Sequence, residues 1–185
     1  MGPPGGHGVN RREFLLAGIA LSGCSTPGLK LDAPYVSTPQ SVIDAMLRLA
    51  QVGAGDMLYD LGCGDGRFVF TAARSFGARG VGSDLDPRRI EQANTAALRA
   101  GVSASVRFAV QDLFKADLSA ASVLTLYLMP ELNAKLLPKL RAELKPGTRV
   151  VSHQFGIGDW PPARSETAWS GTMDHQIFLW VVPPR

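Results

Sequence analysis

The sequence predicts an α/β fold in which a largely parallel sheet carries helices on both faces. Residues 57–61 suit a strand buried on both sides, and a glycine-rich turn and an amphipathic helix follow directly. Residues 79–84 form a second short strand that ends in an acid. Apolar segments then alternate with helical patterns along the chain, which is the order expected of a parallel α/β sheet.

The glycine-rich turn connects the first strand to a helix over 67–76. Gly62, Gly64 and Gly66 remove side chains where the backbone turns sharply and where a ligand can approach it. This is the first unit of a Rossmann-like sheet, but the third glycine falls one place earlier than in the dinucleotide motif G-x-G-x-x-G. The flanking Asp60 and Asp65 would repel a pyrophosphate and attract a ligand with an ammonium and a sulfonium, such as S-adenosylmethionine. A plain strand-to-helix connection without a ligand is the alternative.

Two further acids follow strands. Asp84 lies about 20 residues beyond the turn, where the acid of a Rossmann fold meets ribose hydroxyls. A carboxylate at that place accepts two hydroxyl hydrogen bonds from one sugar. Asp112 follows a third predicted strand, 106–110, and could accept a hydrogen bond from an adenine amino group. The alternative for Asp112 is a plain loop cap.

The remaining elements complete a seven-stranded mixed sheet. A helix preceded by Pro39 has an inner face made of Ile43, Met46, Leu47 and Ala50. Another begins at the Asp86 cap and stops at Gly101, and one from 130 to 144 should kink or restart at Pro138. Strands are expected at 122–128 and 149–153, with an antiparallel pair at 163–169 and 175–182. Residues 156–162 are too short for a helix.

The first 33 residues are expected to lie outside the folded domain of residues 34–185. Segment 1–23 carries Arg11-Arg12 and an apolar run over 14–21, which together resemble a twin-arginine export signal. Leu21-Ser22-Gly23-Cys24 resembles a lipobox, which would make Cys24 a lipidated residue, and 24–33 reads as a linker. This favours a membrane-associated protein of the cell envelope. A tail with chance hydrophobicity, and a cytoplasmic protein, are the alternatives.

Composition argues against two kinds of partner. The net charge is +3 and the basic residues are scattered, so no basic stripe with stacking aromatics marks a nucleic-acid surface. The three histidines and two cysteines lie far apart and offer no metal-ligand spacing. Cys63 sits in the glycine turn, where a packing role is expected and a disulfide is not.

The order of four segments resembles the class I S-adenosylmethionine-dependent methyltransferases. These segments are DLGCGDGR, GSDLDP, QDLF and LTLYLMP, and the resemblance covers about residues 34–155. Pro34-Tyr35-Val36, LYDLGCGDGR and RVVSHQF followed by GDW are similar to bacterial relatives of the ATP synthase c-subunit lysine methyltransferases. This narrower resemblance implies a small membrane-associated protein-lysine N-methyltransferase, with S-adenosylmethionine as cofactor and a protein lysine as acceptor.

The resemblance also implies a set of site residues. Those expected to bind the cofactor are Asp60, Gly62, Cys63, Gly64, Asp65, Gly66, Asp84, Leu85, Gln111, Asp112 and Leu113. Tyr127, at a strand end facing the ligand crevice, could wall the acceptor side or simply pack at the strand end. Tyr35 could line the acceptor channel or pack at the domain edge. His153 could take the lysine proton, directly or through water, or be a strand-end histidine bonded to the backbone.

Other functions remain open at this point. The chain lacks the Asn/Asp-Pro-Pro-Tyr/Phe segment that amide and adenine N-methyltransferases usually carry after the fourth strand, so those acceptors are disfavoured. A membrane-tethered S-adenosylmethionine-binding protein without turnover is one alternative. An NAD-dependent oxidoreductase is another, against which the glycine spacing and Asp65 argue.

Overall fold

The computed structural model describes residues 1–2 and 36–184. The export-like segment, Cys24 and Tyr35 therefore lie outside the described residues, and their predicted roles stay predictions. Among the described residues, no helix combines the length and the apolar character needed to cross a bilayer.

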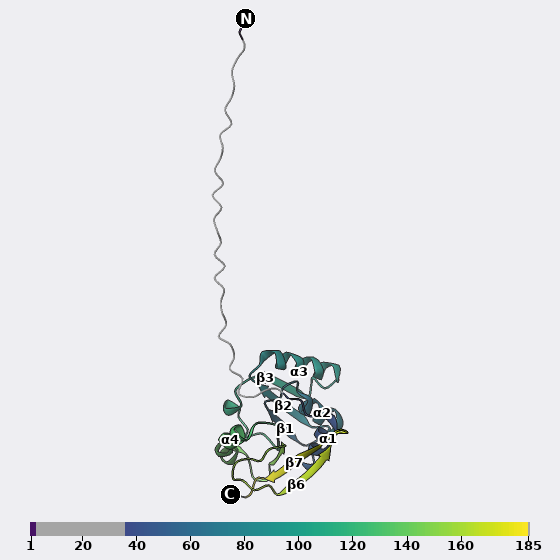
Figure 1. Ribbon diagram of the computed structural model, residues 1–185, viewed down its shortest axis with the longest axis vertical. Helices are drawn as coiled ribbons and strands as arrows, with labels where there is room; N and C mark the ends of the chain where they lie inside the picture. Colours follow the sequence, from purple (N-terminus) through teal and green to yellow (C-terminus); the bar gives the residue numbers. More distant parts are fainter. Residues whose placement is uncertain (3–35, 185) are drawn as a thin grey trace.

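A seven-stranded mixed sheet forms the centre of the domain, as predicted, in the order β3-β2-β1-β4-β5-β7-β6 (Figure 1). Its strands are β1 (Met57–Leu61), β2 (Arg79–Asp84), β3 (Val106–Val110), β4 (Val123–Leu126), β5 (Arg149–His153), β6 (Arg164–Trp169) and β7 (Asp174–Val181). The first five strands are parallel, and β7 is antiparallel to both of its neighbours. The strand order reverses between β1 and β4, and in open α/β sheets ligands bind at this point, beyond the carboxyl ends of the strands.

Helices cover the two faces unequally (Figure 1). Three helices contact one another in sequence and cover one face: α1 (Gln40–Leu49), α2 (Arg67–Phe76) and α3 (Pro87–Arg99). On the other face, leucines of α4 (Pro130–Glu143) share a buried cluster with residues of β4 and β5. A single 3-10 turn, η1 (Leu113–Lys115), follows β3. Residues 156–162 contain no helix, as expected from their length.

The apolar periodicity correctly predicted the buried face of α1, whereas the break expected in α4 differs from the structure. The predicted inner face of α1 is fully buried: Ile43, Met46, Leu47 and the C-cap residue Ala50. The expected restart at Pro138 does not occur, because α4 continues through it as one helix. Pro138 lies on the exposed side of α4, as does the residue four positions earlier, so water can reach the carbonyl that the missing N–H leaves unbonded.

Candidate active site

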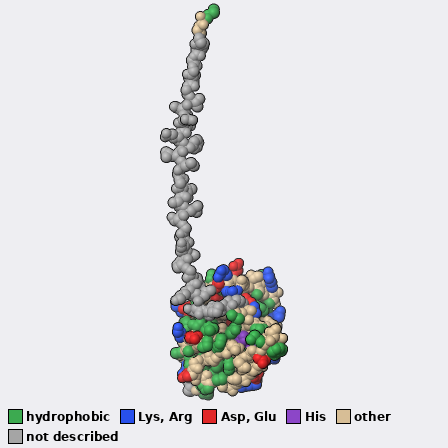
Figure 2. Space-filling model, in the orientation of Figure 1, with side chains coloured by type: hydrophobic (Ala, Val, Ile, Leu, Met, Phe, Trp, Pro, Cys, Tyr) green, Lys and Arg blue, Asp and Glu red, His purple; other side chains and the backbone are tan. Residues whose placement is uncertain are grey.

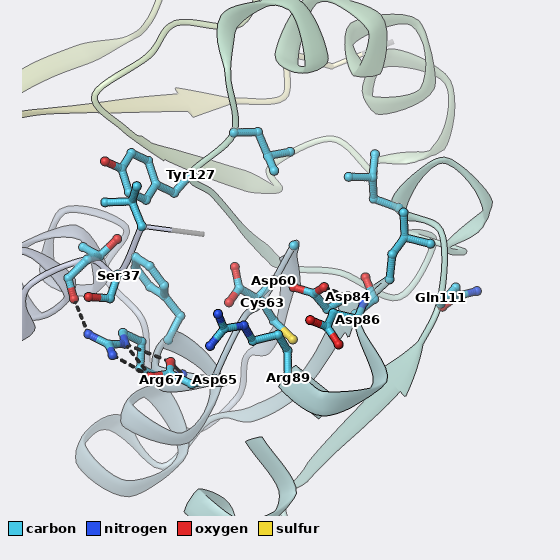
Figure 3. Close-up of a pocket in the computed structure, with 18 of the residues that line it drawn as sticks. Ser37, Asp60, Cys63, Asp65, Arg67, Asp84, Asp86, Arg89, Gln111 and Tyr127 are labelled. Atoms are coloured by element: carbon cyan, nitrogen blue, oxygen red, sulfur yellow. Dashed lines mark hydrogen bonds and ion pairs between the residues drawn. The ribbon is translucent and has the colours of Figure 1, made fainter. Parts of the chain in front are cut away.

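A cavity of about 680 Å³ lies at the carboxyl ends of β1, β2 and β4, where the strand order reverses. Tyr127 and Ser37 stand at one end of the cavity and Gln111 at the other, with Asp60 between them (Figure 3). Nine of the predicted site residues line it: Asp60, Gly62, Cys63, Asp65, Asp84, Leu85, Gln111, Leu113 and Tyr127. Four separate segments of the sequence therefore line one cavity, and the binding roles predicted for their residues stay predictions.

The glycine turn is shaped by backbone conformation as well as by space. Gly62, Gly64 and Gly66 have φ values of 75°, 53° and 78°, in the left-handed region that favours glycine. A Cβ on Gly66 would lie 2.6 Å from a ring carbon of Phe108. Gly62 lines the cavity, whereas Gly64 and Gly66 do not. The latter two therefore shape the turn, and direct cofactor contacts at these positions stay a prediction.

Asp60 is the buried acid of the site. Its side chain is 4% exposed and its Oδ1 accepts a hydrogen bond from Thr125 Oγ1 at 2.8 Å. Burial raises the pKa of Asp60 to about 7, with smaller contributions from the nearby carboxylates of Asp84 and Asp65 and an opposing one from Thr125. The cavity wall therefore holds an acid that a bound cation would help to ionise.

Asp65 is already paired, which the sequence analysis did not foresee. Arg67 Nε donates to Asp65 Oδ1 at 2.8 Å, and Arg67 Nη1 donates to the carbonyl oxygen of Thr38, also at 2.8 Å. The expectation of two uncompensated acids around the turn thus needs correction, because the guanidinium balances the charge of Asp65. Arg67 also ties the turn to segment 36–38, which lines the cavity. The spacing Asp65-x-Arg67 was the available signal for this pair.

Asp84 connects the end of β2 to the glycine turn. Its Oδ2 accepts from the N–H of Gly64 and its Oδ1 accepts from the N–H of Asp86, each at 2.9 Å. Each carboxylate oxygen keeps a further lone pair that a ribose hydroxyl can use. The position predicted to hold the ribose is therefore rigid and faces the cavity.

Asp112 acts as a cap, which was the alternative to its predicted contact with adenine. Its Oδ1 accepts from the N–H of Phe114 at 2.9 Å, which caps η1. Its neighbours Gln111 and Leu113 line the cavity, whereas Asp112 itself does not. A contact between Asp112 and an adenine amino group stays a prediction.

His153 lies behind the acceptor wall rather than in it. It is 1% exposed, its Nδ1 is 3.1 Å from Thr38 Oγ1, and its Nε2 is 2.9 Å from Nδ1 of His175. Burial lowers the pKa of His153 to about 4, with a smaller contribution from His175. A direct transfer of a lysine proton to His153 is not supported by this geometry. The alternative of a strand-end histidine fits better, although its partners are side chains rather than backbone.

Cys63, in the glycine turn, was expected to have a packing role. Cys63 is a free, buried thiol, and burial raises its pKa, so the packing role is supported.

Residues 36–184 contain no group of three acid, histidine or cysteine side chains that could hold a metal ion. Some cavity-lining residues were missed by the sequence analysis: Val36, Ser37, Thr38, Arg67, Phe68, Ser83, Asp86, Arg88, Arg89, Leu128 and Leu132.

Comparison with known proteins identifies the family. Residues 60–164 match the family described as the ANTKMT methyltransferase domain. The chain belongs to this family. It is 42% identical over 150 residues to a protein-lysine N-methyltransferase of Saccharolobus islandicus, across 80% of this chain and 93% of that protein. It is 31% identical over 157 residues to the mouse lysine N-methyltransferase of the ATP synthase c-subunit, across 82% of this chain and 63% of that protein.

A solved structure shows the same fold with the demethylated cofactor bound. It is described as an RNA methyltransferase from Salinibacter ruber in complex with S-adenosyl-L-homocysteine. The identity is 49% and the TM-score 0.77, and the match covers 81% of this chain and 95% of that one. This protein is therefore an S-adenosylmethionine-dependent methyltransferase with the class I fold, as predicted, and the nicotinamide alternative is set aside.

Proposed function

We propose that this methyltransferase transfers its methyl group to the side-chain amine of a protein lysine, and that it does so at a membrane. The observation that carries the acceptor is the identity of 42% to a named protein-lysine N-methyltransferase, over 80% of the chain. The cavity supports it, because Val36, Tyr127, Leu128 and Leu132 give its lining an apolar part. Apolar side chains in the lining suit the stem of a lysine side chain.

Different residues of the cavity would bind the cofactor, stabilise its positive charge and position the acceptor amine. Asp60, Asp84, Gln111 and Leu113 would hold S-adenosylmethionine, which supplies a methyl group already activated on a sulfonium. The ring of Tyr127 next to a cation contributes about 0.5–2 kcal/mol. The attacking amine must be neutral, and apolar walls favour this because desolvation lowers the pKa of a bound lysine. The remaining contribution is positioning of the amine in line with the methyl group, at about 3 Å.

RNA is the second candidate acceptor, since the Salinibacter ruber relative carries that description at 49% identity. Three arginines line the cavity, and two of them are engaged by acids: Arg67 pairs with Asp65, and Arg88 pairs with Asp86. Their charge is thus largely balanced within the protein. This argues for a lysine acceptor over a phosphate-rich one.

The acceptor is tested by incubating the full chain with methyl-tritiated S-adenosylmethionine and three acceptor pools: a lysine-rich soluble protein, a membrane extract and total RNA. Methyllysine in hydrolysed protein is the expected product. Label confined to RNA would instead make the protein an RNA methyltransferase. Tight cofactor binding without label in any pool would favour the tethered binding protein.

Membrane attachment is proposed from the sequence of residues 1–33 and has its own test. We expect the full chain in the membrane fraction, and Cys24→Ser should release it if the lipobox is used. An unchanged soluble distribution of both proteins would favour the cytoplasmic alternative. The protein's need for a cofactor made in the cytoplasm gives this fractionation particular weight.

A further inference from the structure

One residue next to the site has a backbone conformation that glycine usually adopts. Gln154, directly after β5, has a φ of 65°. Among the described residues other than glycine, only Gln51 also has a positive φ, at 52°. The left-handed region is unfavourable for a residue with a Cβ, and it persists only where the surrounding contacts maintain it. The contacts of the turn after β5 therefore show what the strain serves.

Short hydrogen bonds hold the turn on both sides of Gln154. Its N–H donates to the carbonyl oxygen of Gln176 in β7 at 2.7 Å. The N–H of Phe155 donates to the carbonyl oxygen of His153 at 2.8 Å, and a positive φ at the central residue makes this the rarer, strained form of the γ-turn. The carbonyl oxygen of Phe155 accepts from Ser152 Oγ at 2.7 Å. Both backbone polar groups of Phe155 are thus engaged, although its side chain is partly exposed.

A buried asparagine ties this turn to the strand end that carries Tyr127. Asn133 of α4 is fully buried, and its Nδ2 donates to the carbonyl oxygens of Gly156 at 3.0 Å and Leu128 at 3.3 Å. One side chain therefore bridges the segments that follow β4 and β5. Figure 2 shows apolar side chains gathered over the part of the molecule where β1 and α4 lie.

The turn places the ring of Phe155 beside that of Tyr127. Their centroids lie 6.3 Å apart and their planes are inclined by 18°, which is an offset parallel arrangement. Tyr127 lines the cavity, whereas Phe155 does not. Phe155 also belongs to neither of the two apolar clusters that form the core of the described domain. Its ring therefore extends the aromatic surface of Tyr127 from the cavity towards the outside and does not fill the core.

We propose that the rings of Phe155 and Tyr127 form an aromatic track along which the side chain of the acceptor lysine enters, and that Gln154 is the positioning residue of Phe155. The four-carbon stem of lysine extends over roughly 6 Å, which matches the 6.3 Å between the two ring centroids. A stem that lies across Phe155 thus brings its amine to Tyr127. Ring faces bury the methylene groups of the stem and attract a cation.

The chemistry of the step suits this surface. Methyl transfer breaks the bond from sulfur to the methyl carbon and forms the bond from that carbon to nitrogen. The positive charge moves from sulfur to nitrogen, and the new ammonium then releases a proton to water. A ring next to the nitrogen favours the charge that arises there. The inference rests on the proposed lysine acceptor and adds an acceptor-binding residue, Phe155, to it.

Methylation of poly-L-lysine by the full chain, with methyl-tritiated S-adenosylmethionine, tests the aromatic track. Phe155→Leu keeps an apolar side chain and removes the ring. We expect the KM for poly-L-lysine to rise about fivefold in this variant, with the Kd for S-adenosylmethionine unchanged. Phe155→Tyr keeps a ring and should show a much smaller rise.

Gln51 offers a matched control for Gln154. It follows α1, and its carbonyl oxygen accepts from Arg149 at the other end of β5, away from Tyr127. Valine disfavours the left-handed region, so Gln51→Val and Gln154→Val should both lose stability in urea unfolding. Only Gln154→Val should also raise the KM for poly-L-lysine about fivefold, and Gln154→Gly, which suits a positive φ, should be the milder change.

The outcomes separate the possible errors. An unchanged KM in Phe155→Leu, or an equal rise in Phe155→Tyr, would overturn the aromatic track and retain the lysine acceptor. Equal effects of Gln51→Val and Gln154→Val on the KM would mean that both act through stability, and they would overturn the positioning role of Gln154. No label on poly-L-lysine with the unaltered chain would contradict the lysine acceptor itself, and the aromatic track with it.

Discussion

The rings of Tyr127 and His153 lie with their centroids 4.0 Å apart and their planes inclined by 39°, at the ends of adjacent strands β4 and β5. Tyr127 faces the cavity, and His153 supports it from behind while also contacting Thr38. Two sides of the acceptor end therefore depend on one buried imidazole. We infer that His153 is a positioning residue.

Replacement of His153 by Ala should weaken binding of the acceptor more than it slows the chemical step. We expect the KM for the acceptor to rise about tenfold, with cofactor affinity unchanged, because the support of Tyr127 and Thr38 is lost. His153→Gln should recover part of this loss. A general base would instead lower kcat by about 10²–10⁴ and remove a limb of the pH–rate profile, so steady-state kinetics across pH decide between the two roles.

Cofactor binding should depend on the protonation of Asp60. Its folded pKa is about 7, so at pH 6 only about a tenth of the protein has the ionised form that attracts a cation. The Kd for S-adenosylmethionine should fall about tenfold between pH 6 and pH 8, measured by calorimetry. Asp60→Asn should bind more weakly and lose this dependence. An unchanged pH profile in that variant would contradict the assignment.

The same group should affect the stability of the ligand-free protein in the opposite direction. Between pH 4 and 7 the folded protein holds a proton on Asp60 that the unfolded chain, with a pKa near 3.8, has released. Its contribution to the free energy of unfolding therefore falls as pH rises through this range. His153 has a lowered pKa of about 4, so its contribution to the free energy of unfolding rises with pH between about 4 and 6.5. Urea unfolding of Asp60→Asn and His153→Gln across pH separates the two effects.

Replacement of Gly66 by Ala tests the glycine turn. Its φ of 78° costs a side chain about 1–2 kcal/mol, and a Cβ would meet Phe108 at 2.6 Å and Ala93 at 2.8 Å, which adds about 1–3 kcal/mol. Gly101 is the matched control, because its φ is 70° and no atom lies within 4 Å of its added Cβ. Urea unfolding should show a greater loss for Gly66→Ala than for Gly101→Ala. Equal losses would mean that Phe108 yields without cost.

Asp112 can be tested with a modified ligand. If its carboxylate accepts from the adenine amino group, the inosine analogue of S-adenosylhomocysteine should bind about tenfold more weakly than the adenosine form. The difference should disappear in Asp112→Ala. A discrimination that persists in the variant would leave Asp112 as the cap of η1 alone, and thermal unfolding of the variant would report the loss of that cap.

The sequence by itself determined the succession of strands along the chain, the glycine turn over 62–66 and the acid at position 84. These features depend on local patterns: alternation of buried positions, left-handed glycine conformations and a fixed spacing from the turn. The absence of a helix between β5 and β6 could also be predicted, because the seven residues 156–162 are too few to form a helix and connect two strands. Nine of the predicted site residues line one cavity because parallel strands bring their carboxyl ends to the same edge of the sheet.

Tertiary structure alone decided which of those side chains are available. Arg67 reaches Thr38 across 29 positions of sequence, and His153 meets Thr38 across 115 and His175 across 22. No local pattern encodes such pairs, so the partner of Asp65 was not foreseen, and the sequence left open whether His153 accepts a proton or holds the strand end.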